Sequence, residues 1–128
     1  MTPLQLSDFY ADYIAILNAQ DWARLGDVVQ DDVAHNGRLL GLAGYRAMLE
    51  NDFRAIPDLK FTVTQVVSQP PSLAARLHFD CTPAGVLFGL PVHGQRVVFD
   101  ENVFYDLDNG KIRWVWSVID KAAIAAQI

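Results

Sequence analysis

The sequence predicts an α+β fold in which three N-terminal helices pack on one face of a curved, four-stranded antiparallel sheet. Two observations lead to this prediction. Up to about residue 55 the apolar residues recur at helical spacing, and from residue 59 onward they alternate with polar residues, as they do in strands. Because 128 residues are enough for one core and too few for two, we expect residues 1–128 to form a single domain.

The helical half is divided by recognisable start and stop signals. Ser7 and Asp21 are favoured N-cap residues, and Pro57 ends a helix because it cannot donate a backbone hydrogen bond. The predicted elements are a helix from Ser7 to residues 18–20, a shorter helix from Asp21 to Val29, a short extended piece at residues 33–36 and a helix at residues 41–55.

The second half is predicted to be a meander of four strands. The Asn109-Gly110 pair favours a tight hairpin because both residues tolerate positive φ angles. The predicted strands are residues 59–68, 73–82, 96–107 and 111–119, with a Pro70-Pro71 turn and a glycine- and proline-rich loop at residues 83–94.

Composition and charge exclude several classes of function. The net charge of −5 disfavours nucleic acid and anionic membranes as partners. The uncharged stretch at residues 81–95 is interrupted by glycine and proline and cannot form a spanning helix. A lone Cys81 excludes an internal disulfide and a cysteine-based zinc site. Since the start of the chain shows no secretory signal, we expect a cytoplasmic protein.

A series of short motifs extends over nearly the whole chain. The motifs are Asp32-Val33-Ala34-His35-Asn36-Gly37, Gly44-Tyr45, residues 53–59, residues 85–91, residues 94–97 and residues 109–112, followed by Trp116 and Asp120. In this order and spacing they resemble the SnoaL-like polyketide cyclase (ester cyclase) family of the nuclear-transport-factor-like, or cystatin-like, cone superfamily.

The resemblance implies a fold, a chemistry and an assembly. The fold would be a cone in which the helices and the curved sheet enclose one deep, apolar pocket for a small ligand. Similar cyclases close a polyketide ring by an intramolecular aldol condensation, with no cofactor or metal and with an aspartate as acid and base. That aspartate matches Asp120. The family also implies a homodimer formed through the outer face of the sheet.

Asp120 has two competing interpretations. A carboxylate walled by Trp116 and Val118 would lose solvation and become more basic, which suits proton abstraction next to a carbonyl. Asp120 also directly precedes the stretch Lys121 to Ala126, and aspartate is a favoured N-cap for such a helix. The resemblance favours the catalytic interpretation.

A second polar group is needed to stabilise the enolate oxygen. His35 is the first candidate and Asn102 the second. Asn102 shares a strand face with Asp100, whereas Glu101 points to the other face, and the sequence does not decide which face lines the pocket. Relatives often have histidine at the positions of Pro83 and Asn102 and glutamate at that of Val86.

Aromatic residues are the candidates for the pocket wall, although a place in the core is the alternative for those on helices. The segment from Leu87 to Pro91 is a candidate lid, because its glycine permits motion. The candidate substrate-binding residues are Trp116, Tyr45, Phe53, Phe88 and Phe104.

The leading hypothesis is a cofactor-independent acid/base enzyme of the cyclase or isomerase type that acts on a small, apolar, carbonyl-bearing molecule. The alternative is a noncatalytic binding module that uses the same pocket, which the absent histidines favour. For the dimer, we expect the face of residues 96–107 that bears Val97, Phe99, Val103 and Tyr105 to be covered, since such a face is costly to leave in water.

Overall fold

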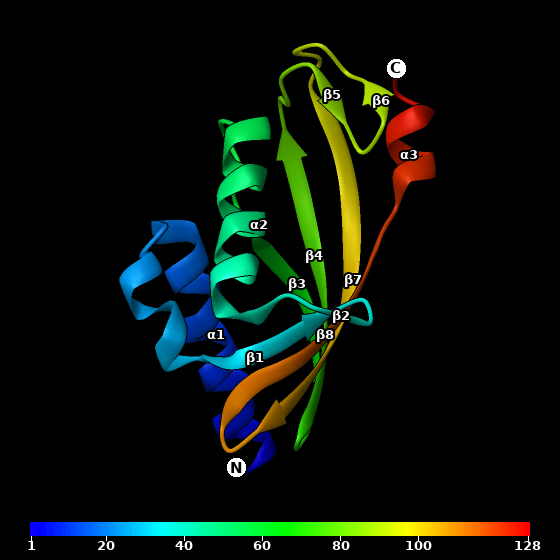
Figure 1. The fold of residues 1–128 in the computed structure, drawn as a ribbon. Coiled ribbons are helices and arrows are strands. Elements are labelled where there is room, and N and C mark those ends of the chain that lie inside the picture. Colours follow the sequence, from blue (N-terminus) through cyan, green and yellow to red (C-terminus); the bar gives the residue numbers. More distant parts are fainter.

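Helices cover one face of the molecule's sheet. The computed structural model describes residues 1–128, and Figure 1 shows its sheet curving past the helices with the two chain termini at opposite ends. The helical elements are α1 (Pro3–Ala19), a 3-10 helix η1 (Trp22–Asp27), α2 (Gly41–Ala55) and a short α3 (Lys121–Ala125). The predicted α+β class is therefore confirmed.

Six strands form the main sheet in the order β2-β1-β8-β7-β4-β3, and a separate two-stranded hairpin, β5-β6, lies in the predicted loop. The strands are β1 (Val29–His35), β2 (Arg38–Leu39), β3 (Thr62–Gln69), β4 (Ser72–Cys81), β5 (Val86–Leu87), β6 (Leu90–Pro91), β7 (Val97–Asp108) and β8 (Lys111–Ile119). Strands β3, β4, β7 and β8 are the predicted antiparallel meander.

The prediction of a purely antiparallel, four-stranded sheet is wrong at β1. This strand pairs in parallel with β8, which makes the sheet mixed. Between Val29 and Ala34 the register shifts, and Asp31, which a regular strand would place on the same face as the buried Val29 and Val33, is exposed. The strand therefore lacks the alternation of buried and exposed residues on which strand prediction depends.

Two helix boundaries also differ from the prediction. Helix α1 begins after Thr2, whose hydroxyl accepts a hydrogen bond from Gln5 N–H while the Gln5 side chain accepts one from Thr2 N–H. This capping box replaces the predicted Ser7 cap. The second helix is a 3-10 helix that ends at Asp27, and the spacing of three between Trp22 and Leu25 fits its three residues per turn.

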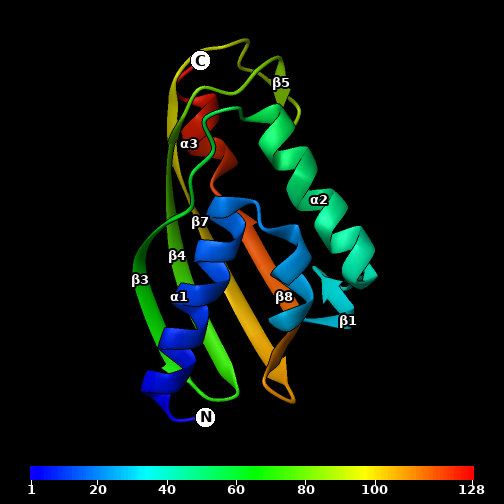
Figure 2. The same cartoon turned by 90° about the vertical axis from the view of Figure 1, so that its left-hand side faces the viewer.

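The core lies between α1, α2 and the concave face of the sheet. Figure 2 shows α1, η1 and α2 in front of the strands, and one cluster of 28 buried residues joins the two layers. Four odd-numbered residues of β7 belong to this cluster: Val97, Phe99, Val103 and Tyr105. The expectation that Val97, Phe99, Val103 and Tyr105 form the dimer face is therefore wrong, because the helices already cover them.

Asn18 provides a test of how α1 is fastened to the sheet. Its Nδ2 donates to the carbonyl oxygen of Phe61 at 3.0 Å, and its Oδ1 accepts from Phe61 N–H at 2.8 Å. We expect Asn18→Ala to lower the free energy of unfolding by about 2 kcal/mol, since both bonds are lost. Urea denaturation measures this value. Asn51→Ala, which loses only an exposed contact to Arg54, is the control, and an equal loss in both variants would contradict the prediction.

Candidate active site

A cavity of about 500 Å³ lies between the helices and the concave face of the sheet. Its volume is in the range of small-molecule sites, and 13 of its 19 lining residues are hydrophobic. The lining residues are Tyr13, Leu17, His35, Asn36, Tyr45, Met48, Leu49, Asp52, Phe61, Leu77, Phe88, Glu101, Val103, Tyr105, Val115, Ser117, Val118, Ile119 and Lys121.

Strand β7 places one carboxylate inside this cavity. Its side chains alternate between the two faces of the sheet, and Val103 and Tyr105 point to the helices. Glu101 shares their face and lines the cavity. On the opposite face, the Oδ1 of Asn102 accepts a hydrogen bond from Arg76 Nε at 3.0 Å, in the exposed cross-strand pair Arg76-Asn102. The inward face is thus the one that carries Glu101.

Glu101 is held by a neighbour on β8. The Ser117 hydroxyl donates a hydrogen bond to a Glu101 carboxylate oxygen. Burial raises the pKa of the Glu101 carboxyl, and the hydrogen bond from Ser117 offsets part of this rise. Glu101 is thus a carboxylate with increased basicity in a mostly apolar cavity.

A second carboxyl group, that of Asp52 on α2, lines the same cavity. Burial, with a further contribution from the negative charge of Glu101, raises the pKa of Asp52 to about 7. A carboxyl with this pKa is divided between its protonated and ionised forms at neutral pH, so it can both donate and accept a proton.

His35 lies at the edge of the cavity, at the end of β1. The next residue, Asn36, fixes this end to β8: its Oδ1 accepts from Ser117 N–H at 2.7 Å and its Nδ2 donates to the Ser117 carbonyl at 3.2 Å. Burial and the positive charge of Arg38 lower the pKa of His35. The imidazole is therefore neutral at neutral pH and can donate or accept one hydrogen bond.

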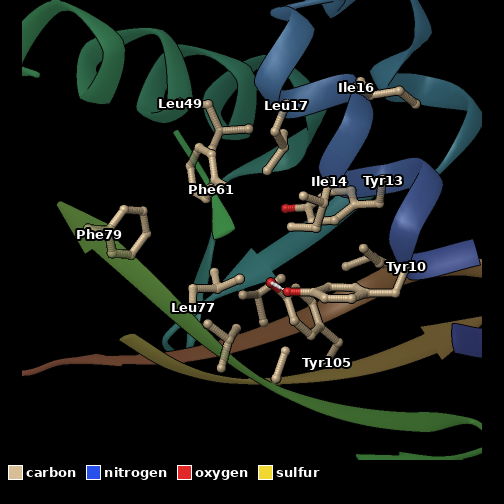
Figure 3. Packing of buried hydrophobic residues seen from close by; sticks show 14 of the residues in the cluster. Tyr10, Tyr13, Ile14, Ile16, Leu17, Leu49, Phe61, Leu77, Phe79 and Tyr105 are labelled. Carbon is tan, nitrogen blue, oxygen red and sulfur yellow. Dashed lines mark hydrogen bonds between the residues drawn. The ribbon is translucent and has the colours of Figure 1, made fainter. Parts of the chain in front are cut away.

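All four tyrosines of the chain gather at one end of the core. The hydroxyls of Tyr13 and Tyr45 are 2.6 Å apart, and those of Tyr10 and Tyr105 are 3.0 Å apart. Figure 3 shows Tyr10 and Tyr13 side by side on α1, with the Tyr10 hydroxyl meeting that of Tyr105. Tyr13, Tyr45 and Tyr105 line the cavity.

The structure divides the residues that the sequence singled out. His35, Tyr45 and Phe88 line the cavity. Phe53 packs edge-on against Trp22, with ring centroids 5.9 Å apart, and lies outside the lining. Three further candidates belong to the outer face of the sheet and are exposed: Asn102, Phe104 and Trp116.

Asp120 lies where the N-cap interpretation places it, at the start of α3. Its carboxylate is exposed and accepts a hydrogen bond from Ala123 N–H at 3.0 Å, which caps α3. The residues on either side of it, Ile119 and Lys121, line the cavity, whereas Asp120 does not. Its catalytic role stays a prediction that the geometry does not favour.

Asp52 was not singled out from the sequence, although a signal was present. Leu49, Phe53 and Ile56 recur at helical spacing, and Asp52 falls between them on the same face. An acidic residue on the apolar face of a helix is unusual unless it has a function or a partner. For Glu101, the sequence showed an acidic residue within a strand, but the direction of its side chain required the sheet.

Neither a metal site nor a membrane span is found among the described elements. No group of three or more His, Cys, Asp or Glu side chains is arranged to hold a metal ion. None of the helices is long and apolar enough to cross a bilayer.

Comparison with known proteins identifies the family. Residues 7–128 match the family described as SnoaL-like polyketide cyclase. A crystal structure of a SnoaL-like polyketide cyclase from Agrobacterium tumefaciens is 54% identical, with a TM-score of 0.94 over 95% of this chain and 96% of that one. No curated protein matches the chain.

More distant structures share the fold. TsrD from Streptomyces laurentii is 19% identical, with a TM-score of 0.86 over 99% of this chain and 96% of that one. IdmH from Streptomyces antibioticus is also 19% identical, with a TM-score of 0.82 over 99% and 98% of the two chains. With the match over residues 7–128, these findings show that the chain belongs to the SnoaL-like polyketide cyclase family.

Proposed function

We propose that the protein is a cofactor-independent acid/base enzyme of the cyclase or isomerase type, which acts on a small, largely apolar molecule that bears a carbonyl group. One observation carries the proposal: two carboxyl groups with raised pKa, Asp52 and Glu101, face a single apolar cavity. Family membership supports a cyclase-type activity. The apolar lining indicates the class of substrate.

The two carboxyl groups have complementary roles in this proposal. The charge of Glu101 helps to keep the proton on Asp52, so Glu101 is the carboxylate and Asp52 the acid. Glu101 takes a proton from the carbon next to a carbonyl and leaves an enolate. In a ring closure, the enolate carbon bonds to a second carbonyl carbon, and the alkoxide that forms there receives the proton of Asp52. Each proton therefore has a donor and an acceptor within the cavity.

Asp120 is the competing base, because the family resemblance assigns the reaction to this position. It stands at the end of β8, directly after a cavity residue. Asparagine is also a good N-cap, so Asp120→Asn removes the base while it keeps the cap on α3. The two assignments can thus be compared without unfolding the terminal helix.

The ionisation of Asp52 can be tested without a substrate. A folded-state pKa near 7, above the ordinary value of 3.8 for an aspartate side chain, means that folding favours the protonated carboxyl. The resulting stabilisation is complete below about pH 4 and is lost as the pH rises through about 7. We expect the free energy of unfolding of the wild type to fall over this window relative to that of Asp52→Asn, as measured by urea titrations at several pH values. Parallel pH profiles for the two proteins would contradict the raised pKa.

Proton abstraction can be tested with 1-tetralone, an apolar bicyclic ketone, as a probe. We expect the wild type to exchange the proton on the carbon next to the carbonyl for deuterium, as followed by NMR in D₂O. Glu101→Gln should slow this exchange by about 100-fold or more, the usual contribution of a general base. Asp120→Asn should retain it.

Other outcomes of the exchange experiment would favour either Asp120 as the base or a protein without catalytic activity. If Asp120→Asn loses the exchange and Glu101→Gln retains it, the general base is Asp120 and not Glu101. A wild type that binds 1-tetralone without exchange would overturn the enzymatic proposal and favour the noncatalytic binding module.

We also propose that two copies of the chain associate through the outer face of the sheet. This face carries large apolar side chains with high exposed fractions: 63% for Phe104, 48% for Trp116 and 70% for Val118. They lie side by side across β7 and β8, where Phe104 pairs with Trp116. A contiguous apolar patch of this kind is typical of an interface.

The dimer is tested by replacing one residue of this patch with a charge. We expect sedimentation equilibrium to show a dimer for the wild type and a monomer for Phe104→Lys, since a buried lysine without a partner opposes association. Leu4→Lys changes an apolar residue with 71% exposure on α1 and should leave the dimer intact. A monomeric wild type, or a dimeric Phe104→Lys, would contradict the proposal.

A further inference from the structure

The hydroxyl groups of Tyr13 and Tyr45 leave one hydrogen-bond donor unused. Each tyrosine has one O–H group, and within a pair only one of the two can donate to the other. Neither hydroxyl has another hydrogen-bond partner in the protein. Both residues are almost fully buried, with exposed fractions of 1% and 2%. A buried donor without an acceptor is costly, and here it borders the cavity.

The second tyrosine pair, Tyr10 and Tyr105, does not always have its unused donor on a cavity-lining residue. Both Tyr13 and Tyr45 line the cavity, so the unused O–H of their pair belongs to a cavity-lining residue whichever hydroxyl donates. In the pair of Tyr10 and Tyr105, only Tyr105 lines the cavity. When Tyr105 donates to Tyr10, the unused O–H belongs to Tyr10, which does not line the cavity. The Tyr13-Tyr45 pair is thus the one that always presents a donor.

Two other polar groups of the cavity are already engaged in hydrogen bonds. The Ser117 hydroxyl donates to Glu101, and the Asn36 amide is bonded to the backbone of Ser117. Lys121 is exposed, with its ammonium 5.7 Å from the ring centroid of Phe88. Besides His35 at the edge, Lys121 and the protonated Asp52, which the proposed reaction uses as its acid, the tyrosine pair is therefore a donor available to a ligand inside the cavity.

The pair also lies within the electrostatic reach of the proposed base. Burial raises the pKa of both tyrosines, and the negative charge of Glu101 contributes to the rise. The hydroxyls stay protonated at working pH, as a donor must. A substrate oxygen held at the pair would lie in the same cavity as the Glu101 carboxylate.

We propose that the Tyr13-Tyr45 hydroxyl pair binds the carbonyl oxygen of the substrate and stabilises the enolate oxygen that forms from it. The unused O–H donates to this oxygen, and the hydrogen bond within the pair strengthens that donor by polarising it. The inference rests on the proposed function for the identity of the reacting group. It orients the substrate: the ketone oxygen lies at the tyrosines, and the carbon next to it faces Glu101.

The test compares two ligands of the same shape, 1-tetralone and tetralin, which lacks the carbonyl oxygen. Isothermal titration calorimetry of the wild type should show a preference for the ketone of about ten-fold, the effect expected of one buried hydrogen bond. In the double variant Tyr13→Phe/Tyr45→Phe this preference should disappear, while tetralin binds as before. Both hydroxyls are removed together because either one alone can still donate to the ketone.

The control is Tyr10→Phe, which removes a buried hydroxyl from the other pair at a residue that does not line the cavity. It should keep the preference for the ketone. The proposal is overturned if the wild type shows no preference, if the Tyr13→Phe/Tyr45→Phe variant keeps it, or if only the control variant loses it. Unchanged tetralin affinity establishes that the cavity of each variant is intact.

A second measurement uses the wild-type sequence, in case the double variant does not fold. With 3-fluorotyrosine at the four tyrosines, ¹⁹F NMR should show larger shifts for Tyr13 and Tyr45 than for Tyr10 when 1-tetralone replaces tetralin. Shifts confined to Tyr10 and Tyr105 would overturn the proposal. These readouts are independent of turnover: ketone preference at Tyr13-Tyr45 without deuterium exchange would refute the proposed enzyme and leave the binding role in place.

Discussion

The alternation of side chains along β7 is the constraint on which the site depends. This strand of 12 residues pairs with β4 on one side and β8 on the other, so its backbone is fixed along its length. Side chains alternate in direction along a strand, so the strand face that buries Val103 and Tyr105 under the helices also points Glu101 into the cavity. Asn102 and Phe104 point to the opposite, outer face for the same reason. A shift of register by one residue would exchange the two sets.

The raised pKa values follow from this placement and from the helix opposite. Glu101 and Asp52 come from different elements, β7 and α2, and meet at a cavity whose walls are mostly apolar. Burial disfavours the charge of each carboxylate, and the charge of Glu101 further disfavours that of Asp52. The fold tolerates this cost because the Ser117 hydroxyl stabilises Glu101 and the proton on Asp52 removes the second charge.

Hydrogen bonds connect the elements that form the cavity. Asn36 joins the end of β1 to β8 through the backbone of Ser117, and Ser117 in turn reaches Glu101 on β7. On the helical side, the Tyr13 and Tyr45 hydroxyls link α1 to α2. The proposed base, Glu101, thus comes from the sheet, whereas the proposed acid, Asp52, and the tyrosine pair come from the helices. The parallel pairing of β1 with β8 positions His35 at the sheet side of the cavity.

The sequence by itself determined the fold class, the helix at residues 41–55, the four-stranded meander and the family resemblance, because each depends on local periodicity, turn residues or short motifs. It predicted an extended piece at residues 33–36 but neither the start of β1 at Val29 nor its parallel pairing with β8, because the exposed Asp31 and Asp32 interrupt the alternation of the strand. It singled out His35, which lines the cavity, and favoured Asp120, which does not, over Glu101, which does. Only the tertiary structure decided the direction of the Glu101 side chain, since local sequence cannot tell which face of a strand the helices cover. The meeting of Asp52 with Glu101, and of Tyr13 with Tyr45, likewise joins residues distant in the chain and requires the packed layers.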